Sequence, residues 1–167
     1  VKIGASPVWM RQRLQAIGIR SINNVVDAAN YVLMETGHPL HTFDLRYIEG
    51  GKIVVRKAGD KEKITTLDGK ERELDDSVLL ICDAKKPVAV AGIMGGENSE
   101  VKDDTTDLLL ESAFFDAVVV RRGAKKLQLA TDASHRFERG TDPNGIPFAL
   151  DRLASLIVEL AGGEITQ

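Results

Sequence analysis

The spacing of apolar residues changes period twice along this chain, which indicates helices at both ends and strands between them. Residues 6–36 and 117–162 favour helices, while residues 52–113 consist of short apolar runs separated by turn residues. No internal repeat and no low-complexity linker interrupts this order. We therefore predict an α+β fold with a mostly antiparallel sheet core and flanking helices.

The first predicted helix has Ser6 as its N-cap, Pro7 at its first helical position and Gly18 at its end. Its expected apolar face comprises Val8, Trp9, Leu14 and Ile17. The second predicted helix is capped by Asn23 or Asn24. The expected apolar positions of the last helix are Phe148, Leu150, Leu153, Ile157 and Leu160.

The middle of the chain carries the signals of a sheet. Asp68-Gly69 lies between two candidate strands and predicts a hairpin turn. The runs "SVLLICD" (77–83) and "PVAVAGIM" (87–94) predict buried strands. Cys82 lies within the first run, so we expect a small buried hydrophobe there and not a nucleophile.

Composition fits one domain spanning residues 1–167, which is long enough to bury about 70% of its unfolded surface without disulfides or a metal. The net charge of −3 does not indicate nucleic-acid binding, although cations cluster in "RRGAKK" (121–126) and "HRFER" (135–139). No apolar run reaches the length of a membrane span, and no signal peptide is recognisable. Because the chain lacks an initial methionine, we expect a segment of a longer protein.

The stretch "GHPLHTFD" (37–44) holds two of the three histidines, His38 and His41. Gly37 and Pro39 exclude a regular helix here, and no further ligand pattern supports a metal site. Two interpretations stay open. A proline-held loop presents one histidine to a cleft, or a histidine is bonded to the backbone.

Three other stretches carry candidate chemistry, each with a structural alternative. Glu111, inside the apolar run "LLLESAFF", either lines a pocket or points outward from a strand. The glycines of "AGIMGGENS" (91–99) permit close approach to a ligand but match no dinucleotide fingerprint, so they equally fit a plain loop. In "TDASHRFERG" (131–140), the adjacent Ser134 and His135 cannot form a nucleophile–base pair. The arginines of that stretch suit either phosphate or neighbouring acids.

Four stretches together resemble, in order and spacing, the central tRNA-binding and editing domain of the β subunit of bacterial phenylalanyl-tRNA synthetase. They are "SPVWMRQRLQAIGIRSINNVVDAANYVLMETGHPLHTFD", "AVAGIMGGENSEV", "LLLESAFFD" and "LATDASHRFERGTDP". The resemblance covers essentially the whole chain and implies the editing-domain fold of that subunit. It also implies hydrolysis of tyrosine mistakenly esterified to tRNA(Phe), within a ligase that charges this tRNA with phenylalanine. Such a second site is needed because an apolar pocket rejects an added hydroxyl only about a hundredfold.

The resemblance further implies the setting of the domain. Its partners would be tRNA(Phe), the mischarged tyrosyl ester and an α subunit in a cytoplasmic α2β2 heterotetramer, with no DNA and no membrane. ATP and magnesium would serve the aminoacylation site of the α subunit. For this domain the resemblance implies no cofactor and no metal.

Matching positions in the resemblance imply a set of site residues. The substrate-binding set comprises Arg20, Pro39, Gly95, Glu111, Thr131 and Ala133. His41 is the implied catalytic residue near the ester, where we expect it to position the attacking water, and Glu111 is assigned to the tyrosine hydroxyl. Backbone N–H groups around Gly95 are expected to stabilise the oxyanion. His38 falls where relatives often carry glutamine and is expected to be incidental.

Two rival functions remain at this point. One is a non-catalytic module for tRNA docking or subunit packing, and the other is a free-standing deacylase acting in trans. A metal-dependent hydrolase is disfavoured by the small number of candidate ligands.

Overall fold

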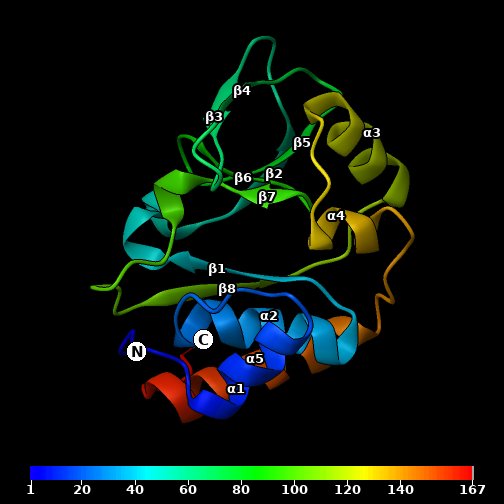
Figure 1. Cartoon of the computed structure of the whole chain (residues 1–167). Coiled ribbons are helices and arrows are strands. Elements are labelled where there is room, and N and C mark those ends of the chain that lie inside the picture. Colours follow the sequence, from blue (N-terminus) through cyan, green and yellow to red (C-terminus); the bar gives the residue numbers. More distant parts are fainter. Residues whose placement is uncertain (167) are drawn as a thin grey trace. The chain divides into compact units, whose positions relative to one another are not determined.

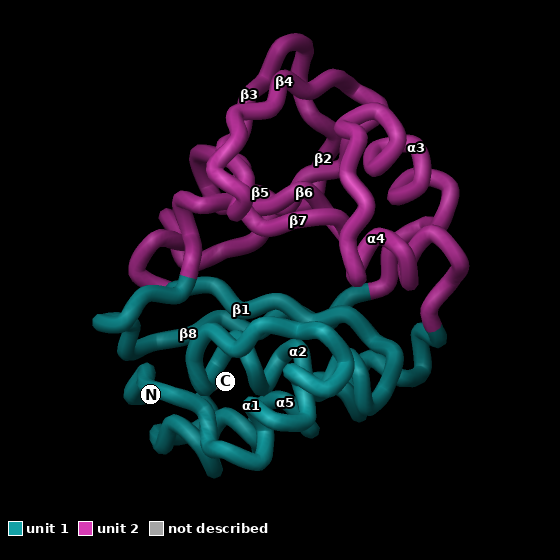
Figure 2. The backbone as a smooth tube through the Cα atoms, viewed as in Figure 1, with its two compact units in different colours: residues 1–44, 101–113, 142–167 teal, residues 45–100, 114–141 magenta. Residues whose placement is uncertain are grey.

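The computed structural model describes residues 1–166, which divide into two compact units (Figure 2). Unit 1 comprises residues 1–44, 101–113 and 142–166, and unit 2 comprises residues 45–100 and 114–141. All strand pairs in the described part of the chain are antiparallel, and helices accompany strands in both units. The predicted α+β class is confirmed. No described helix is long and apolar enough to cross a bilayer.

Unit 1 is a helical layer on one face of a two-stranded sheet. β1 (Leu40–Asp44) pairs with β8 (Leu108–Ser112), while α2 (Asn24–Thr36) and α5 (Gly145–Ala161) pack against this pair and against each other (Figure 1). α1 (Val8–Ala16) packs on α2. The core between these elements includes Met10, Leu14, Val25, Val32, Leu153 and Ile157.

Unit 2 contains a four-stranded sheet with the strand order β2-β5-β6-β7. The strands are β2 (Val54–Lys57), β5 (Leu79–Cys82), β6 (Pro87–Val90) and β7 (Met94–Gly95). Cys82 is buried in this sheet, as predicted. The other buried side chains of the unit include Val78, Leu80, Val88, Val90 and Val120.

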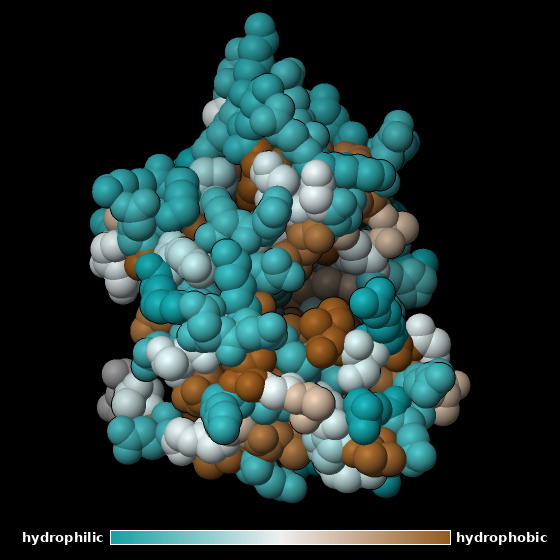
Figure 3. All heavy atoms as spheres, turned by 60° about the vertical axis from the view of Figure 1, so that its left-hand side comes forward, coloured by the Kyte–Doolittle hydropathy of each residue, from teal (hydrophilic) through white to brown (hydrophobic). Residues whose placement is uncertain are grey.

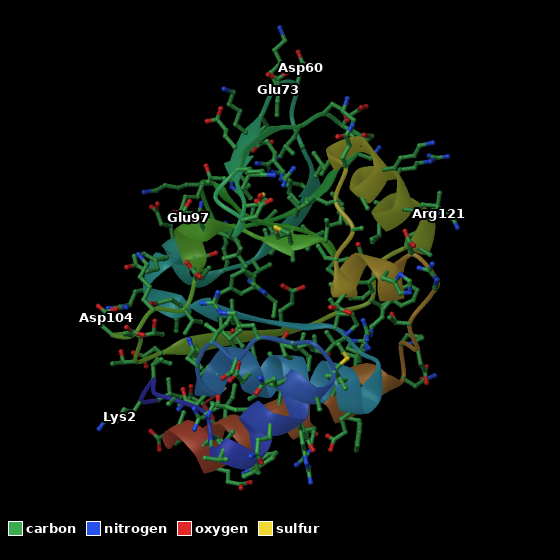
Figure 4. All side chains as sticks on the ribbon, viewed as in Figure 1. Lys2, Asp60, Glu73, Glu97, Asp104 and Arg121 are labelled. Carbon is green, nitrogen blue, oxygen red and sulfur yellow. The ribbon has the colours of Figure 1, made fainter. Side chains whose placement is uncertain are left out.

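A hairpin and two helices complete unit 2. The hairpin consists of β3 (Lys63–Thr65) and β4 (Glu71–Glu73). Figure 3 shows that the end of this unit that carries Asp60 and Glu73, labelled at the top of Figure 4, is hydrophilic. α3 (Ala117–Leu127) packs against β5 and against α4 (Asp132–Phe137). Short 3-10 turns occupy η1 (Leu45–Tyr47), η2 (Glu49–Gly51) and η3 (Glu97–Ser99).

The predicted N-cap of α2 and the predicted hairpin are confirmed. The side chain of Asn23 accepts hydrogen bonds from the backbone N–H groups of Val25 and Val26, and so caps α2. Gly37 ends that helix in the left-handed region, with φ 75°. Gly69 supplies the positive φ, 73°, of the β3–β4 turn.

The predicted start of α1 is wrong by one residue. Pro7, not Ser6, occupies the N-cap position, and the helix begins at Val8. The reason is a tertiary hydrogen bond, because the Ser6 hydroxyl donates to the fully buried carboxylate of Asp27. Asp27 also accepts the backbone N–H of Ile22, so it ties the segment before α1 and the segment before α2 to α2 itself.

The predicted apolar faces of two helices are partly wrong. In α1 the buried side chains are Met10 and Leu14. The other members of the predicted face, all exposed, are Val8, Trp9 and Ile17. The Trp9 ring instead packs edge-on against Tyr31, with ring centroids 5.5 Å apart. In α5 Phe148 is 66% exposed. Periodicity identified the helices but not the rotation of each helix toward the core.

Two elements differ from the sequence-based expectation. The proline-held loop, one of the two interpretations left open for "GHPLHTFD", does not apply to His41, because residues 40–44 form strand β1. The partner strand β8 lies more than sixty residues further along the chain, so its pairing leaves no local signal. Helix α4 was not predicted. Its start is marked by a capping box in which Thr131 and Ser134 bond reciprocally.

Gly92 has a packing role in unit 2. Its φ is 67°, and a Cβ at this position would lie 3.0 Å from a ring atom of Phe115 and 3.1 Å from atoms of Phe137 and Val120. The two phenylalanine rings pack edge-on, with centroids 5.0 Å apart. The absence of a side chain at Gly92 therefore lets the backbone pack closely against core side chains of unit 2.

We predict that Gly92→Ala lowers the free energy of unfolding by about 2–4 kcal/mol, because it adds left-handed strain to a steric overlap. Urea denaturation of both proteins measures the change. Gly4→Ala is the matched control, since its Cβ would meet nothing within 4 Å and its φ is not positive. Equal stabilities of the two variants would contradict the packing role.

Candidate functional site

The register of β1 against β8 brings His41 and Glu111 together. Figure 1 shows β1 and β8 side by side, and the register of this antiparallel pair makes the two residues direct Cα partners. Cβ atoms of directly opposed residues lie about 4.5–5.5 Å apart and on the same face. Leu40, Leu108 and Leu110 pack on the helical core of unit 1. Since side chains alternate along a strand, His41 and Glu111 lie on the opposite face, away from those helices.

His41 is held by an aromatic neighbour that the sequence-based site did not include. The imidazole packs edge-on against Phe43, with ring centroids 4.5 Å apart and an interplanar angle of 78°. Phe43 is almost fully buried. The two residues are separated by one position, so strand alternation in "HTF" was the signal that places them on one face. A buried ring at this position restricts the orientation of the imidazole.

Burial changes the protonation of His41. It lowers the pKa of His41 from 6.5 to about 4, because the charged imidazolium is poorly solvated there. At neutral pH the imidazole is therefore uncharged. It can accept a hydrogen bond from water but binds a proton weakly, which suits positioning better than full proton abstraction.

Glu111 has a carboxyl oxygen that lacks a hydrogen-bond partner. Within the described residues, no donor lies within hydrogen-bond distance of Glu111 Oε2, and this atom is buried. Burial raises the pKa of Glu111 from 4.5 to about 7. A buried oxygen without a hydrogen-bond donor is unfavourable in the free protein. A ligand that donates a hydrogen bond to this oxygen would therefore be stabilised at this position. Of the two interpretations left open by the sequence, the structure supports the buried one.

His38 has the structural role that the sequence left open for one of the two histidines. Its side chain is buried, and it forms a hydrogen bond with the backbone of Ala113. Burial lowers the pKa of His38, and that hydrogen bond partly opposes the effect. The backbone-bonded interpretation therefore applies to His38, while His41 lies on the strand face with Glu111.

Two other predicted site residues, Pro39 and Arg20, belong to unit 1. Pro39 is buried directly before β1 and leads the chain from Gly37 into the strand. Arg20 is exposed and lines a separate hollow of about 440 Å³. The remaining residues around that hollow are Arg11, Gln15, Gly18, Ile19 and Ser21. Neither His41 nor Glu111 belongs to it.

Three predicted site residues belong to unit 2, where two have backbone partners. Gly95 is buried in β7, and its carbonyl accepts the N–H of Leu67 at 3.0 Å. Thr131 caps α4 and donates its hydroxyl to the carbonyl of Ile93 at 2.8 Å. Ala133 follows in the first turn of α4. These bonds hold the start of α4 beside the end of the sheet.

The backbone next to Gly95 has fewer free N–H donors for an oxyanion than expected. The N–H of Gly96 already donates to the carbonyl of Val88 at 2.8 Å. A Cβ at Gly96 would lie only 2.7 Å from that same carbonyl oxygen, so the two segments are in close contact. The N–H of Gly96 is therefore committed to the sheet.

The arginines of "TDASHRFERG" pair with neighbouring acids. Arg136 contacts Asp132 at 2.9 Å and Arg139 contacts Glu138 at 2.6 Å. Of the two roles that the sequence left open for them, acid pairing is the one observed. No three His, Cys, Asp or Glu side chains converge as metal ligands in the described part of the chain.

The chain matches the B3/4 domain family over residues 1–162. It is 59% identical to the phenylalanine–tRNA ligase β subunit of Syntrophus aciditrophicus (strain SB), over 99% of this chain and 20% of that protein. Identity to the same subunit of Geobacter metallireducens is 60%, over 98% of this chain and 20% of that protein. For Protochlamydia amoebophila it is 58%, over 99% and 21%. The chain thus spans about one fifth of the length of these relatives.

The opposite pKa changes predict opposite pH dependences of stability. The folded state holds Glu111 protonated up to about pH 7 and His41 neutral down to about pH 4, so the two contributions nearly cancel between pH 4.5 and 6.5. Glu111→Gln removes the Glu111 contribution, so its free energy of unfolding relative to the parent should rise with pH across this window. His41→Gln removes the His41 contribution, so its free energy of unfolding relative to the parent should fall with pH.

The full change in each variant amounts to roughly 2–3 kcal/mol, from about 1.4 kcal/mol per pH unit. Urea denaturation at half-unit pH steps measures it as the difference from the parent protein at each pH, so that the contribution of His38, which all three proteins share, cancels. If the two variants had slopes of the same sign, the assigned protonation states would be wrong.

Proposed function

The chain belongs to the B3/4 domain family, and from this premise we propose that it is the editing domain of a phenylalanyl-tRNA synthetase β subunit that hydrolyses tyrosyl-tRNA(Phe). The observation that carries the proposal is the buried, unpartnered Oε2 of Glu111, directly across the strand pair from His41. The proposed whole enzyme is a cytoplasmic α2β2 ligase. ATP and magnesium would serve its α subunit.

Recognition in this proposal depends on one hydrogen bond. A tyrosine phenol has a pKa near 10, so it donates at neutral pH. The Oε2 atom of Glu111 accepts a hydrogen bond from the phenol hydroxyl. This bond removes the cost of a buried oxygen without a partner. Phenylalanine has no donor and would leave the same oxygen buried without a partner. A site of this kind discriminates by roughly 10⁴ or more.

Catalysis in this proposal is the attack of water on the ester carbonyl. The bond between the carbonyl carbon and the ribose oxygen breaks, and the ribose oxygen receives a proton. His41 accepts a hydrogen bond from the attacking water and orients it, because its depressed pKa keeps the imidazole neutral. Phe43 holds the ring in place. A base with a pKa near 4 removes protons weakly, so the final proton acceptor is a substrate hydroxyl or bulk water.

The remaining site residues have proposed roles in substrate placement. Thr131 and Ala133 at the start of α4 and Gly95 in β7 are assigned to substrate binding by the family resemblance. Arg20 and Pro39 are also assigned to substrate binding by the family resemblance. Arg20 would contact the substrate from the hollow that it lines, and neither His41 nor Glu111 lines that hollow.

We predict that His41→Ala lowers kcat for tyrosyl-tRNA(Phe) hydrolysis by about 10²-fold, the usual cost of misplacing a reactant. Release of tyrosine from purified tyrosyl-tRNA(Phe) under single-turnover conditions measures this rate. His38→Gln is the matched control, since His38 is buried beside the same strand but has a structural role. Undiminished hydrolysis by His41→Ala would remove the imidazole from the mechanism. A parent protein without hydrolysis would favour the non-catalytic docking module.

We predict that Glu111→Ala loses the preference for tyrosyl over phenylalanyl ester while keeping a measurable rate. The ratio of kcat/KM for the two esters reports this discrimination. Glu111→Gln retains a carbonyl acceptor and should keep part of the preference. If Glu111→Ala discriminated as well as the parent, another group would have to bind the phenol.

A further inference from the structure

Helix α3 concentrates positive charge in an acidic protein. Its sequence, "AVVVRRGAKKL", contains four cations and no acid. The whole chain has a net charge of −3, so the residues outside α3 sum to −3 − 4 = −7. The charge of this helix is therefore opposite in sign to that of the rest of the chain, and it is concentrated in eleven residues. Solvation of the surface alone does not require such a concentration of positive charge.

The geometry of α3 sorts these charges onto one face. The inner face packs into unit 2 through the buried residues Val120, Gly123, Ala124 and Leu127. Arg121, Arg122 and Lys125 recur at helical spacing on the opposite side, and all three are exposed. Figure 4 shows Arg121 on the outer side of the helix. These three residues are called the α3 basic face below.

The α3 basic face is not neutralised by the protein. Within residues 1–166, none of its three side chains forms an ion pair or a side-chain hydrogen bond. The fourth cation of the helix, Lys126, pairs with Asp75 at 2.8 Å. Binding an anion on the α3 basic face would therefore break no internal pair.

A hollow of about 370 Å³ adjoins the end of α3. It is lined by Leu129, Ala130, Thr131, Asp132, Ser134, His135 and Glu138. Leu129 follows α3 by two residues, and its N–H donates to the carbonyl of Ala124 at 2.9 Å. Thr131 is one of the residues proposed to bind substrate. The basic face and this part of the proposed substrate site thus belong to one continuous piece of unit 2.

We infer that the α3 basic face binds the phosphate backbone of the RNA substrate close to its aminoacylated end. This inference rests on the proposed function, which supplies an RNA with a reactive 3′ end. The guanidinium groups of Arg121 and Arg122 present planar donor pairs that match phosphate oxygens. Along a helix, Arg121 and Lys125 are spaced by about 6 Å, so successive turns can contact successive phosphates.

Filter binding of deacylated tRNA(Phe) to the full chain tests the inference, since deacylated RNA requires no hydrolysis. The test variant is Arg121→Gln/Arg122→Gln/Lys125→Gln. The matched control, Lys57→Gln/Lys61→Gln/Lys70→Gln, removes the same charge from exposed lysines around β2 and the hairpin. Both variants and the parent are measured between 50 and 200 mM salt, because backbone binding depends on salt.

The test variant should bind roughly 30-fold more weakly at the low-salt end, and its salt slope should fall by about 2. The control should bind within about threefold of the parent. Arg121→Lys/Arg122→Lys keeps the charge but loses the planar donor pairs, so its affinity should lie between those of the parent and the triple variant, which separates charge from folding. Circular dichroism melting verifies that all variants are folded.

The binding measurements would overturn the inference if both triple variants were weakened equally, if the α3 variant bound as well as the parent, or if the parent did not bind at 50 mM salt. Displacement of the RNA by polyglutamate as effectively as by competitor tRNA would also overturn it, in favour of an acidic protein partner.

The outcome is separable from that of the proposed function. RNA binding through α3 without hydrolysis of the tyrosyl ester would contradict the proposed function but not the RNA-binding role of α3. Hydrolysis with an unchanged KM in the α3 variant would contradict the RNA-binding role of α3 but not the proposed function.

Discussion

The structure of unit 1 depends on the register between β1 and β8. Leu40, Leu108 and Leu110 must face α2 and α5, and the alternation of a strand then sends His41 and Glu111 to the other face. A slip of one residue would expose the leucines and bury the two titratable groups in the helical core. Hydrophobic packing therefore fixes the geometry of the candidate site, even though the leucines take no part in its chemistry.

Burial then determines what this pair of side chains can do. A histidine and a glutamate in water at pH 6 would both be charged, but here burial favours the neutral form of each. The result is an uncharged imidazole fixed by Phe43 beside a carboxyl group with an unused oxygen. Such a pair recognises donors and orients water. It does not resemble the strong acid–base pairs that cleave unactivated bonds, and an aminoacyl ester does not need one.

Much of the fold follows from local signals in the sequence, whereas the site does not. Caps and turns such as Asn23 and Gly69 are encoded within a few residues, and the structure confirms them. Strand β1 and the exposure of Trp9 depend on partners distant in sequence. Gly37 and Pro39 therefore suggested a loop where β1 forms, and helical periodicity placed Trp9 on the apolar face of its helix. Glu111 illustrates the limit, because its apolar neighbours could not distinguish a pocket from an outward-facing strand. The register against β1 supplies the missing information.

The most direct test of hydroxyl recognition by Glu111 is a crystal structure of the protein with bound tyrosine. The phenol oxygen should lie about 2.5–2.8 Å from a carboxyl oxygen of Glu111, with the amino-acid carboxyl group directed toward His41. Tyrosine bound with its phenol in solvent, or bound away from β1 and β8, would contradict this basis for proofreading.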